Sequence, residues 1–219
     1  KADRIIQLID ECKVMDLKIM PPSINQPRAE FGVDGDETIL FGMGAVKGVG
    51  ATAIESVMGT HRELGRPFND LFDLCEHVDL QKVNRKVLES LVHAGALDSL
   101  PGDRATLIGN LDAALSHGQR TARDREAGQV SLFGGGDPAA DIRPTLQPAE
   151  PYDPLLEWSL ERKAVGFFLS GHPFQEYREL MTSLPVQTVQ LALNKGEGAW
   201  VDLAGVITSF RNARDKHKR

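Results

Sequence analysis

The stretch GMGAVKGVGATAIESVM (residues 42–58) decides the fold that we expect of this sequence. Gly48 and Gly50 lie on either side of Val49, and a helical spacing of apolar residues begins directly after them. This pattern predicts a tight turn that leads into a helix. The first amides of such a helix have no partner inside it and lie at the positive end of the helix dipole. The stretch therefore predicts a backbone turn that can hold an anion.

The composition of the turn suits a helix-hairpin-helix grip on DNA phosphates. Glycine lets the backbone approach a bulky anion, and a neighbouring lysine adds a positive charge. Such contacts read no bases, so binding is expected to be independent of DNA sequence. A plain helix-to-helix turn whose glycines allow close packing would show the same pattern. The amides of about Val49 to Thr52 are expected to lack intrahelical partners. The residues that the DNA interpretation assigns to the turn are Lys47, Gly48, Val49, Gly50, Ala51 and Thr52.

A second candidate hairpin lies in KVNRKVLESLVHAGALDSL (82–100), where two helices are joined by a short glycine turn. Two hairpins in tandem can pack as a pseudo-twofold pair and straddle a duplex. Cations at the start of a helix interact unfavourably with the helix dipole. An external phosphate would explain their position here, and so would a solvated polar face. Leu97 stands where the first hairpin has Gly50, which leaves packing as the alternative role of this hairpin. Its DNA-binding candidates are Lys82, Arg85, Lys86 and Gly95.

Outside the hairpins, the sequence predicts a mainly α chain. Residues 31–33 and 38–41 flank a turn and predict a small β-hairpin. Residues 118–154 hold five glycines and five prolines, which predicts a flexible linker. Residues 199–210 predict one strand, whose domain would be incomplete in this chain. Helices are predicted at residues 2–18, 51–64, 70–77, 84–93, 103–124, 155–169 and 174–183, with Pro21 and Pro22 ending the first.

Composition narrows the possible environments of the chain. The 219 residues include no run of the ~20 apolar residues that a membrane span needs. Two distant cysteines suit a reducing cytoplasm better than a disulfide scaffold, so we expect a cytoplasmic protein without membrane partners. The net charge of -6 does not exclude DNA binding, because backbone amides hold phosphates without adding charge.

No catalytic, metal or cofactor residues are assigned from the sequence. Two-metal nucleotidyl transfer needs converging carboxylates that hold ions about 4 Å apart. Asp34, Asp36 and Glu37 form a dense acidic cluster, but they occupy a predicted turn tip and are expected to be solvated. The six histidines show no pairing suited to zinc.

A short peptide in the predicted linker has the character of a docking motif. Residues 129–133, QVSLF, place two large apolar side chains in a polar segment that offers nothing nearby to bury them. Exposed Leu132 and Phe133 would enter an apolar pocket on a partner, with the Gln129 amide at its rim. The alternative is that both side chains fold back on the helical unit. The candidate contacts are Gln129, Ser131, Leu132 and Phe133.

Five stretches in register resemble the alpha subunit of bacterial DNA polymerase III, and the resemblance covers essentially the whole chain. They are KIMPPSIN (18–25), ILFGMGAVKGVG (39–50), NRKVLESLVHAGALDSL (84–100), QVSLF (129–133) and ERKAVGFFLSGHP (161–173). The intact QVSLF favours the replicative form over its error-prone paralogue, and the segment order fits the Gram-positive PolC type poorly.

The resemblance implies a division into four parts. Residues 1–30 would end the fingers, 31–117 would be the β-hairpin and tandem helix-hairpin-helix domain, and 118–154 the linker. Residues 155–219 would be a helical connector and the first strand of a truncated OB domain.

The resemblance also implies partners. These are duplex DNA, the sliding clamp (beta subunit) at residues 129–133, and other subunits of the polymerase holoenzyme. Single-stranded DNA is associated with the OB domain, and the basic end of the chain (211–219) would belong to a DNA-facing loop or to a solvated turn. The catalytic aspartates and their Mg²⁺ would lie upstream, in the palm.

Two other function classes remain open from the sequence. An interaction region of a helix-hairpin-helix repair nuclease or helicase would carry nuclease carboxylates or ATPase motifs in adjoining sequence. A structural helical adaptor would bind no DNA at any salt concentration.

Overall fold

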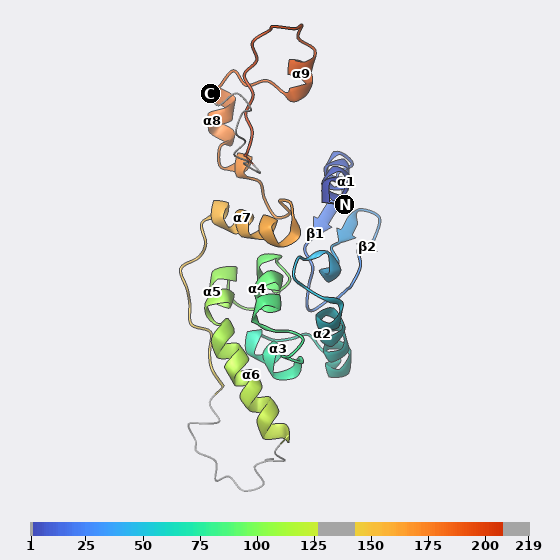
Figure 1. Cartoon of the computed structure of the whole chain (residues 1–219), viewed down its shortest axis with the longest axis vertical. Helices are drawn as coiled ribbons and strands as arrows, with labels where there is room; N and C mark the ends of the chain where they lie inside the picture. The colour runs from blue at the N-terminus through green and yellow to red at the C-terminus, as the bar shows by residue number, and fades with distance from the viewer. Residues whose placement is uncertain (1, 127–142, 208–219) are drawn as a thin grey trace, which may run out of the picture. The chain divides into compact units, whose positions relative to one another are not determined.

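The computed structural model describes residues 2–126 and 143–207, and these are mainly helical (Figure 1). The chain divides into two compact units, residues 1–170 and 171–219. Within the described residues, no helix is long and apolar enough to cross a membrane.

The first unit begins with a helix and a small sheet. Helix α1 (Ala2–Val14) is followed by strands β1 (Lys18–Met20), β2 (Gly32–Asp34) and β3 (Thr38–Leu40). The predicted hairpin is confirmed, since β2 and β3 pair antiparallel. The predicted helix over 2–18 is too long, because Asp16 adopts a positive φ of 58° and the next residues pair with β3 in parallel. Pro21 and Pro22 therefore follow a strand.

The helical core follows the short 3-10 helix η1 (Met43–Ala45). It consists of α2 (Ala51–Leu64), α3 (Leu71–His77), α4 (Arg85–His93), α5 (Arg104–Gly109) and α6 (Leu111–Glu126). In Figure 1, α6 runs beside α3, and α4 lies against α5 and α6. These helices bury a common apolar core, whose fully buried members include Leu71, Leu74, Leu88, Leu97, Leu107 and Leu111.

The predicted helix over 103–124 is broken at Asn110. Its side chain donates to the Gln147 carbonyl at 2.8 Å and accepts from the Gln147 amide at 2.9 Å. The Ala149 amide also donates to Thr106 Oγ1 at 3.1 Å. Of the predicted linker, residues 118–126 continue α6, and residues 143–149 bond to α3, to α5 and to Asn110 between α5 and α6.

Helix α7 (Pro154–Val165) completes the first unit by packing on α4 (Figure 1). It contributes to a second apolar cluster, which also includes Ile9, Phe41, Val46, Ala94 and Phe167. The helix ends four residues earlier than predicted, because Gly166 leaves the helical conformation and its amide bonds back to the Arg162 carbonyl. Helix α7 thus belongs to the first unit, which extends to residue 170.

The second unit contains η2 (Pro173–Gln175), α8 (Arg178–Ser183) and α9 (Val189–Leu193). The prediction of a strand at 199–210 is wrong for residues 199–207, which form no ladder, and 208–210 lie outside the described residues. A strand needs a partner, and here the Gln187 amide bonding to the Asp202 carbonyl at 2.8 Å does not extend into one. Trp200 is consequently 96% exposed.

Candidate nucleic-acid interface

The first predicted hairpin is a tight turn between η1 and α2. Gly48 has a φ of +83°, a left-handed conformation that other residues adopt only at a cost. The Lys47 amide donates to the Ala164 carbonyl at 2.8 Å, so the turn is tied to α7. Lys47, Gly48, Gly50, Ala51 and Thr52 are all exposed, which leaves the turn accessible from solvent.

The N-terminus of α2 has no side-chain cap. Gly50 occupies the N-cap position, and the first turn of the helix contains no acidic residue. A Cβ built on Gly50 would meet nothing within 4 Å, so packing does not require glycine there. The helices α3, α4, α5 and α7, in contrast, begin with side chains that accept an amide: Asp70, Asn84, Asp103 and Asp153.

Three consecutive amides at this helix start are free to bind an anion. The amides of Ala53 and Ile54 bond to the Gly50 carbonyl. Among the hydrogen bonds of the described residues, none uses the amides of Gly50, Ala51 or Thr52. The Val49 amide also lacks a partner within α2, but it closes the turn onto the Val46 carbonyl at 3.3 Å.

Several polar and charged groups of the second predicted hairpin already bond to other groups of the chain. Its helix α4 is capped by Asn84, which accepts the Val87 amide. Lys82 pairs with Asp79 at 3.0 Å, and Arg85 contacts both Asp112 and Glu89. The hydrogen bond to Asp112 raises the pKa of Arg85. Two of the three cations that suggested an external phosphate therefore have partners within the chain.

Gly95 and Leu97 of this hairpin serve packing. Gly95 is buried at a φ of +81°, and a Cβ there would lie 2.6 Å from Arg104 Nη2 and 3.2 Å from Pro21 Cβ. Leu97 is 0% exposed and belongs to the core. The second turn thus faces the protein interior, which explains why leucine replaces the glycine of the first turn.

The structure brings Lys47 and Lys86 together with Lys163, a residue that the sequence did not single out. They line a hollow of about 550 Å³, which we call the lysine hollow. Its other lining residues are Gly48, Glu89, Ser90, His93, Leu160 and Ala164. Burial, together with the charges of Arg104 and Lys163, lowers the pKa of His93. The only sequence signal for Lys163 was its basic neighbourhood in a helix considered a connector.

A buried ion cluster fixes α7 beside α4 and α5. Arg104, 6% exposed, contacts Asp98 at 2.7 Å and Glu161 at 3.3 Å. Glu161 is fully buried and also accepts the amides of Leu169 and Ser170. Burial alone would lower the pKa of Arg104, but its bond to Asp98 and the nearby carboxylates raise it above the ordinary value. Arg104 therefore stays positively charged despite its burial.

One group of possible metal ligands occurs among the described residues, formed by Asp73, Glu76 and His77 with ligand atoms within 4.8 Å. The sequence did not indicate this grouping. Its carboxylates are already engaged, since Arg66 binds Asp73 and Arg143 binds Glu76. His117 Nε2 also lies 2.8 Å from Glu76. The group is therefore a set of ion pairs that joins α3 to its neighbours.

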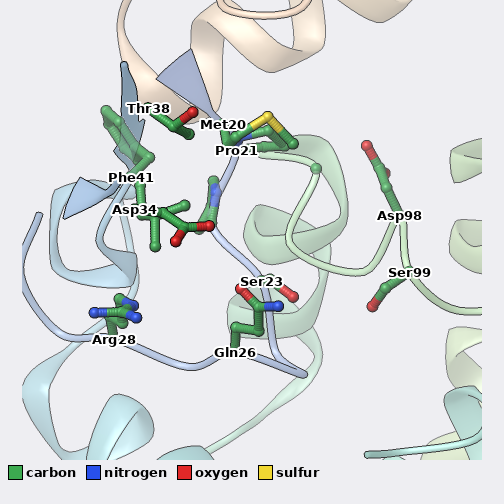
Figure 2. A pocket seen from close by; sticks show the side chains of 13 residues that line it. Met20, Pro21, Ser23, Gln26, Arg28, Asp34, Thr38, Phe41, Asp98 and Ser99 are labelled. Carbon is green, nitrogen blue, oxygen red and sulfur yellow. The ribbon is translucent and has the colours of Figure 1, made fainter. Parts of the chain in front are cut away.

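A second hollow, of about 530 Å³, lies between the sheet and the segment after α4. Figure 2 shows Arg28 and Asp34 on one side and Asp98 and Ser99 across from them. Asp34 is exposed, as expected, but it is the last residue of β2 and not part of the turn, and it also lines this hollow. Because acidic and basic groups mix here, this hollow is less suited to phosphate than the lysine hollow.

The predicted docking residues 129–133 lie outside the described residues.

Residues 16–107 match a family described as a helix-hairpin-helix motif. This range contains both predicted hairpins, and the free helix start of α2 lies in its middle. The first unit thus contains a segment that matches a helix-hairpin-helix motif.

Over nearly its whole length, the chain is also similar to bacterial proteins named DNA polymerase III subunit alpha. It is 38% identical to that of Haemophilus influenzae over 98% of this chain and 19% of the relative. Identity to that of Pseudomonas aeruginosa is 35% over 98% of this chain and 20% of the relative. Identity to that of Escherichia coli K12 is 38% over 80% of this chain and 15% of the relative. The chain spans about a fifth of the curated relatives that it matches. It is a homologue of one segment of the DNA polymerase III alpha subunits, as the sequence resemblance predicted.

Proposed function

We propose that this chain is the part of a DNA polymerase III alpha subunit that holds duplex DNA by its phosphate backbone. The observation that carries the proposal is the start of α2, where the amides of Gly50, Ala51 and Thr52 have no protein acceptor and no capping carboxylate competes for them. Lys47 and Lys86 add positive charge nearby. The contacts are with phosphates, so affinity is independent of base sequence.

The proposed grip is asymmetric. The first hairpin provides the free amides, while the second provides Lys86 and a packed turn. Lys82, Arg85 and Gly95 contribute less, because the two cations are paired and the glycine is buried. Within the polymerase, this region would keep the duplex bound while nucleotidyl transfer and its Mg²⁺ belong to another part of the protein.

Residues 129–133 supply the proposed tether to the sliding clamp. Leu132 and Phe133 are the apolar anchors, and Gln129 and Ser131 supply polar contacts. The homology to alpha subunits of DNA polymerase III supports this assignment. The role of the OB region in binding single-stranded DNA is proposed on the same ground.

The variant Gly50→Asp tests the grip on duplex DNA. A carboxylate at this N-cap accepts the free amides, so it should raise the free energy of unfolding by about 0.5–1 kcal/mol. It should also weaken the binding of unrelated duplexes equally, because it occupies and repels the phosphate position. Fluorescence anisotropy at several salt concentrations measures the binding, and urea unfolding measures the stability.

The matched control is Gln119→Glu, which makes the same change of net charge at an exposed position of α6. Equal affinities of Gly50→Asp and this control would contradict the grip. A loss that depends on base sequence would contradict backbone recognition. A wild-type chain that binds no duplex at any salt concentration would favour the structural adaptor.

A further inference from the structure

The lysine hollow has an excess of positive charge. Among the described residues, Lys47, Lys86 and Lys163 form no ion pair. Glu89 is the one carboxylate in the lining, and it pairs with Arg85 at 3.1 Å. This local excess contrasts with the net charge of -6 of the whole chain. Converging like charges repel one another, so an anion in the hollow would be stabilised.

Two further groups in the hollow can donate hydrogen bonds to an anion. Gly48 is exposed with the turn, and no hydrogen bond of the described residues uses its amide. A Cβ on Gly48 would lie 3.3 Å from Ser90 Oγ, so the hydroxyl borders the same space. Glycine at 48 thus keeps the approach to both donors open.

The position of Lys163 relative to the turn is fixed by two contacts. The Lys47 amide bonds to the Ala164 carbonyl, one residue after Lys163. The buried pair of Arg104 and Glu161 holds the same helix against α5. Helix α7 lies outside residues 16–107, which match the helix-hairpin-helix family. The hollow therefore combines the hairpin with a helix from beyond the motif.

We propose that Lys163 of α7 binds a backbone phosphate of the duplex, together with Lys47 and Lys86, in addition to the phosphate held at the start of α2. This inference rests on the proposed function. It makes α7 a part of the DNA-binding surface and extends the grip by one phosphate contact. Like the amide contacts, it is independent of base sequence.

The test compares duplex binding by the 219-residue chain and its variants Lys163→Gln and Lys163→Arg, using fluorescence anisotropy over a range of salt concentrations. Losing one phosphate contact should reduce the slope of log K against log salt by about 0.9 and affinity by roughly eightfold at about 0.1 M salt. Arginine keeps the charge and should preserve the slope. Lys163 is exposed, so neither variant should change the melting temperature.

The control is Lys18→Gln, the same change at an exposed position of β1 that does not line the hollow. If Gly50→Asp weakens binding while Lys163→Gln only matches Lys18→Gln, the inference is overturned and the proposed function stands. If the wild-type chain binds no duplex at any salt concentration, both are overturned. A slope reduced by Lys163→Gln alone, and restored by Lys163→Arg, supports the additional contact.

Discussion

Asp73 illustrates how single residues hold the helical core together. Its side chain is nearly buried, and its carboxylate accepts two bonds from Arg66, at 2.6 and 2.9 Å, and one from the Asn69 amide at 2.8 Å. The hydrogen bond to Arg66 is the main reason that the pKa of Asp73 falls from 3.8 to about 2. The charged form is therefore stabilised in the folded chain relative to the unfolded one.

The variant Asp73→Asn should lower the free energy of unfolding at pH 7 by about 1–2 kcal/mol, since Arg66 is partly exposed and solvent screens the pair. The folded-state pKa is depressed, so this stabilisation is present above the unfolded pKa of 3.8 and is lost as pH falls through about 2. Urea unfolding at a series of pH values should show the two chains converging near the lower limit. The exposed Asp112→Asn is the control, with a loss below about 1 kcal/mol.

At the scale of elements, the turn before α2 and the helix itself use glycine for different reasons. Gly48 lies in the left-handed region, whereas Gly59 lies inside α2. A Cβ on Gly59 would meet nothing within 4 Å, but one on Gly48 would approach Ser90. Only the first of these glycines is required by the backbone conformation.

Alanine substitutions at the two positions should therefore have opposite effects. Gly48→Ala should lower the free energy of unfolding by about 1–2 kcal/mol, because alanine is strained at this φ. Gly59→Ala should raise it by about 0.5–1 kcal/mol, because alanine favours the helix. Thermal or urea unfolding measures both. A Gly48→Ala chain as stable as the wild type would show that the turn conformation does not control stability here.

The elements themselves differed in how far local sequence predicted them. Helix α2 has the predicted bounds, 51–64, because apolar spacing and a glycine before its start are local signals. Strand β1 was missed, since its partner β3 begins twenty residues after it and its own three residues carry no strand pattern. The break at Asn110 was missed for the same reason, because its cause is hydrogen bonding to Gln147.

At the scale of the whole molecule, residues 129–133 come after α6 and before the segment that leads into α7 in the order of the sequence. The DNA grip and the tether therefore use separate residues. Substitutions should therefore remove DNA binding or clamp docking separately. This distinguishes a clamp-docking peptide from one that stabilises the helical unit.

The double variant Leu132→Ala/Phe133→Ala should abolish binding to purified sliding clamp, because both apolar anchors are lost. Duplex affinity and melting temperature should stay at wild-type values. Surface plasmon resonance on immobilised clamp measures the first, with Val130→Ala in the same peptide as the control. Unchanged clamp affinity would contradict the assignment of this peptide as a docking motif. A lowered melting temperature would favour the alternative, in which the peptide folds back on the helical unit.

The sequence by itself determined the helical class, the bounds of α2, the first hairpin turn and the homology to DNA polymerase III alpha subunits, because these depend on local patterns along the chain. Only the tertiary structure decided which candidate residues come together. Lys82 and Arg85 are neutralised by partners that local spacing does not reveal, and Gly95 is buried against Pro21 and Arg104. Lys163 joins Lys47 across more than a hundred residues, because packing of α7 on α4 brings separate parts of the chain into one surface.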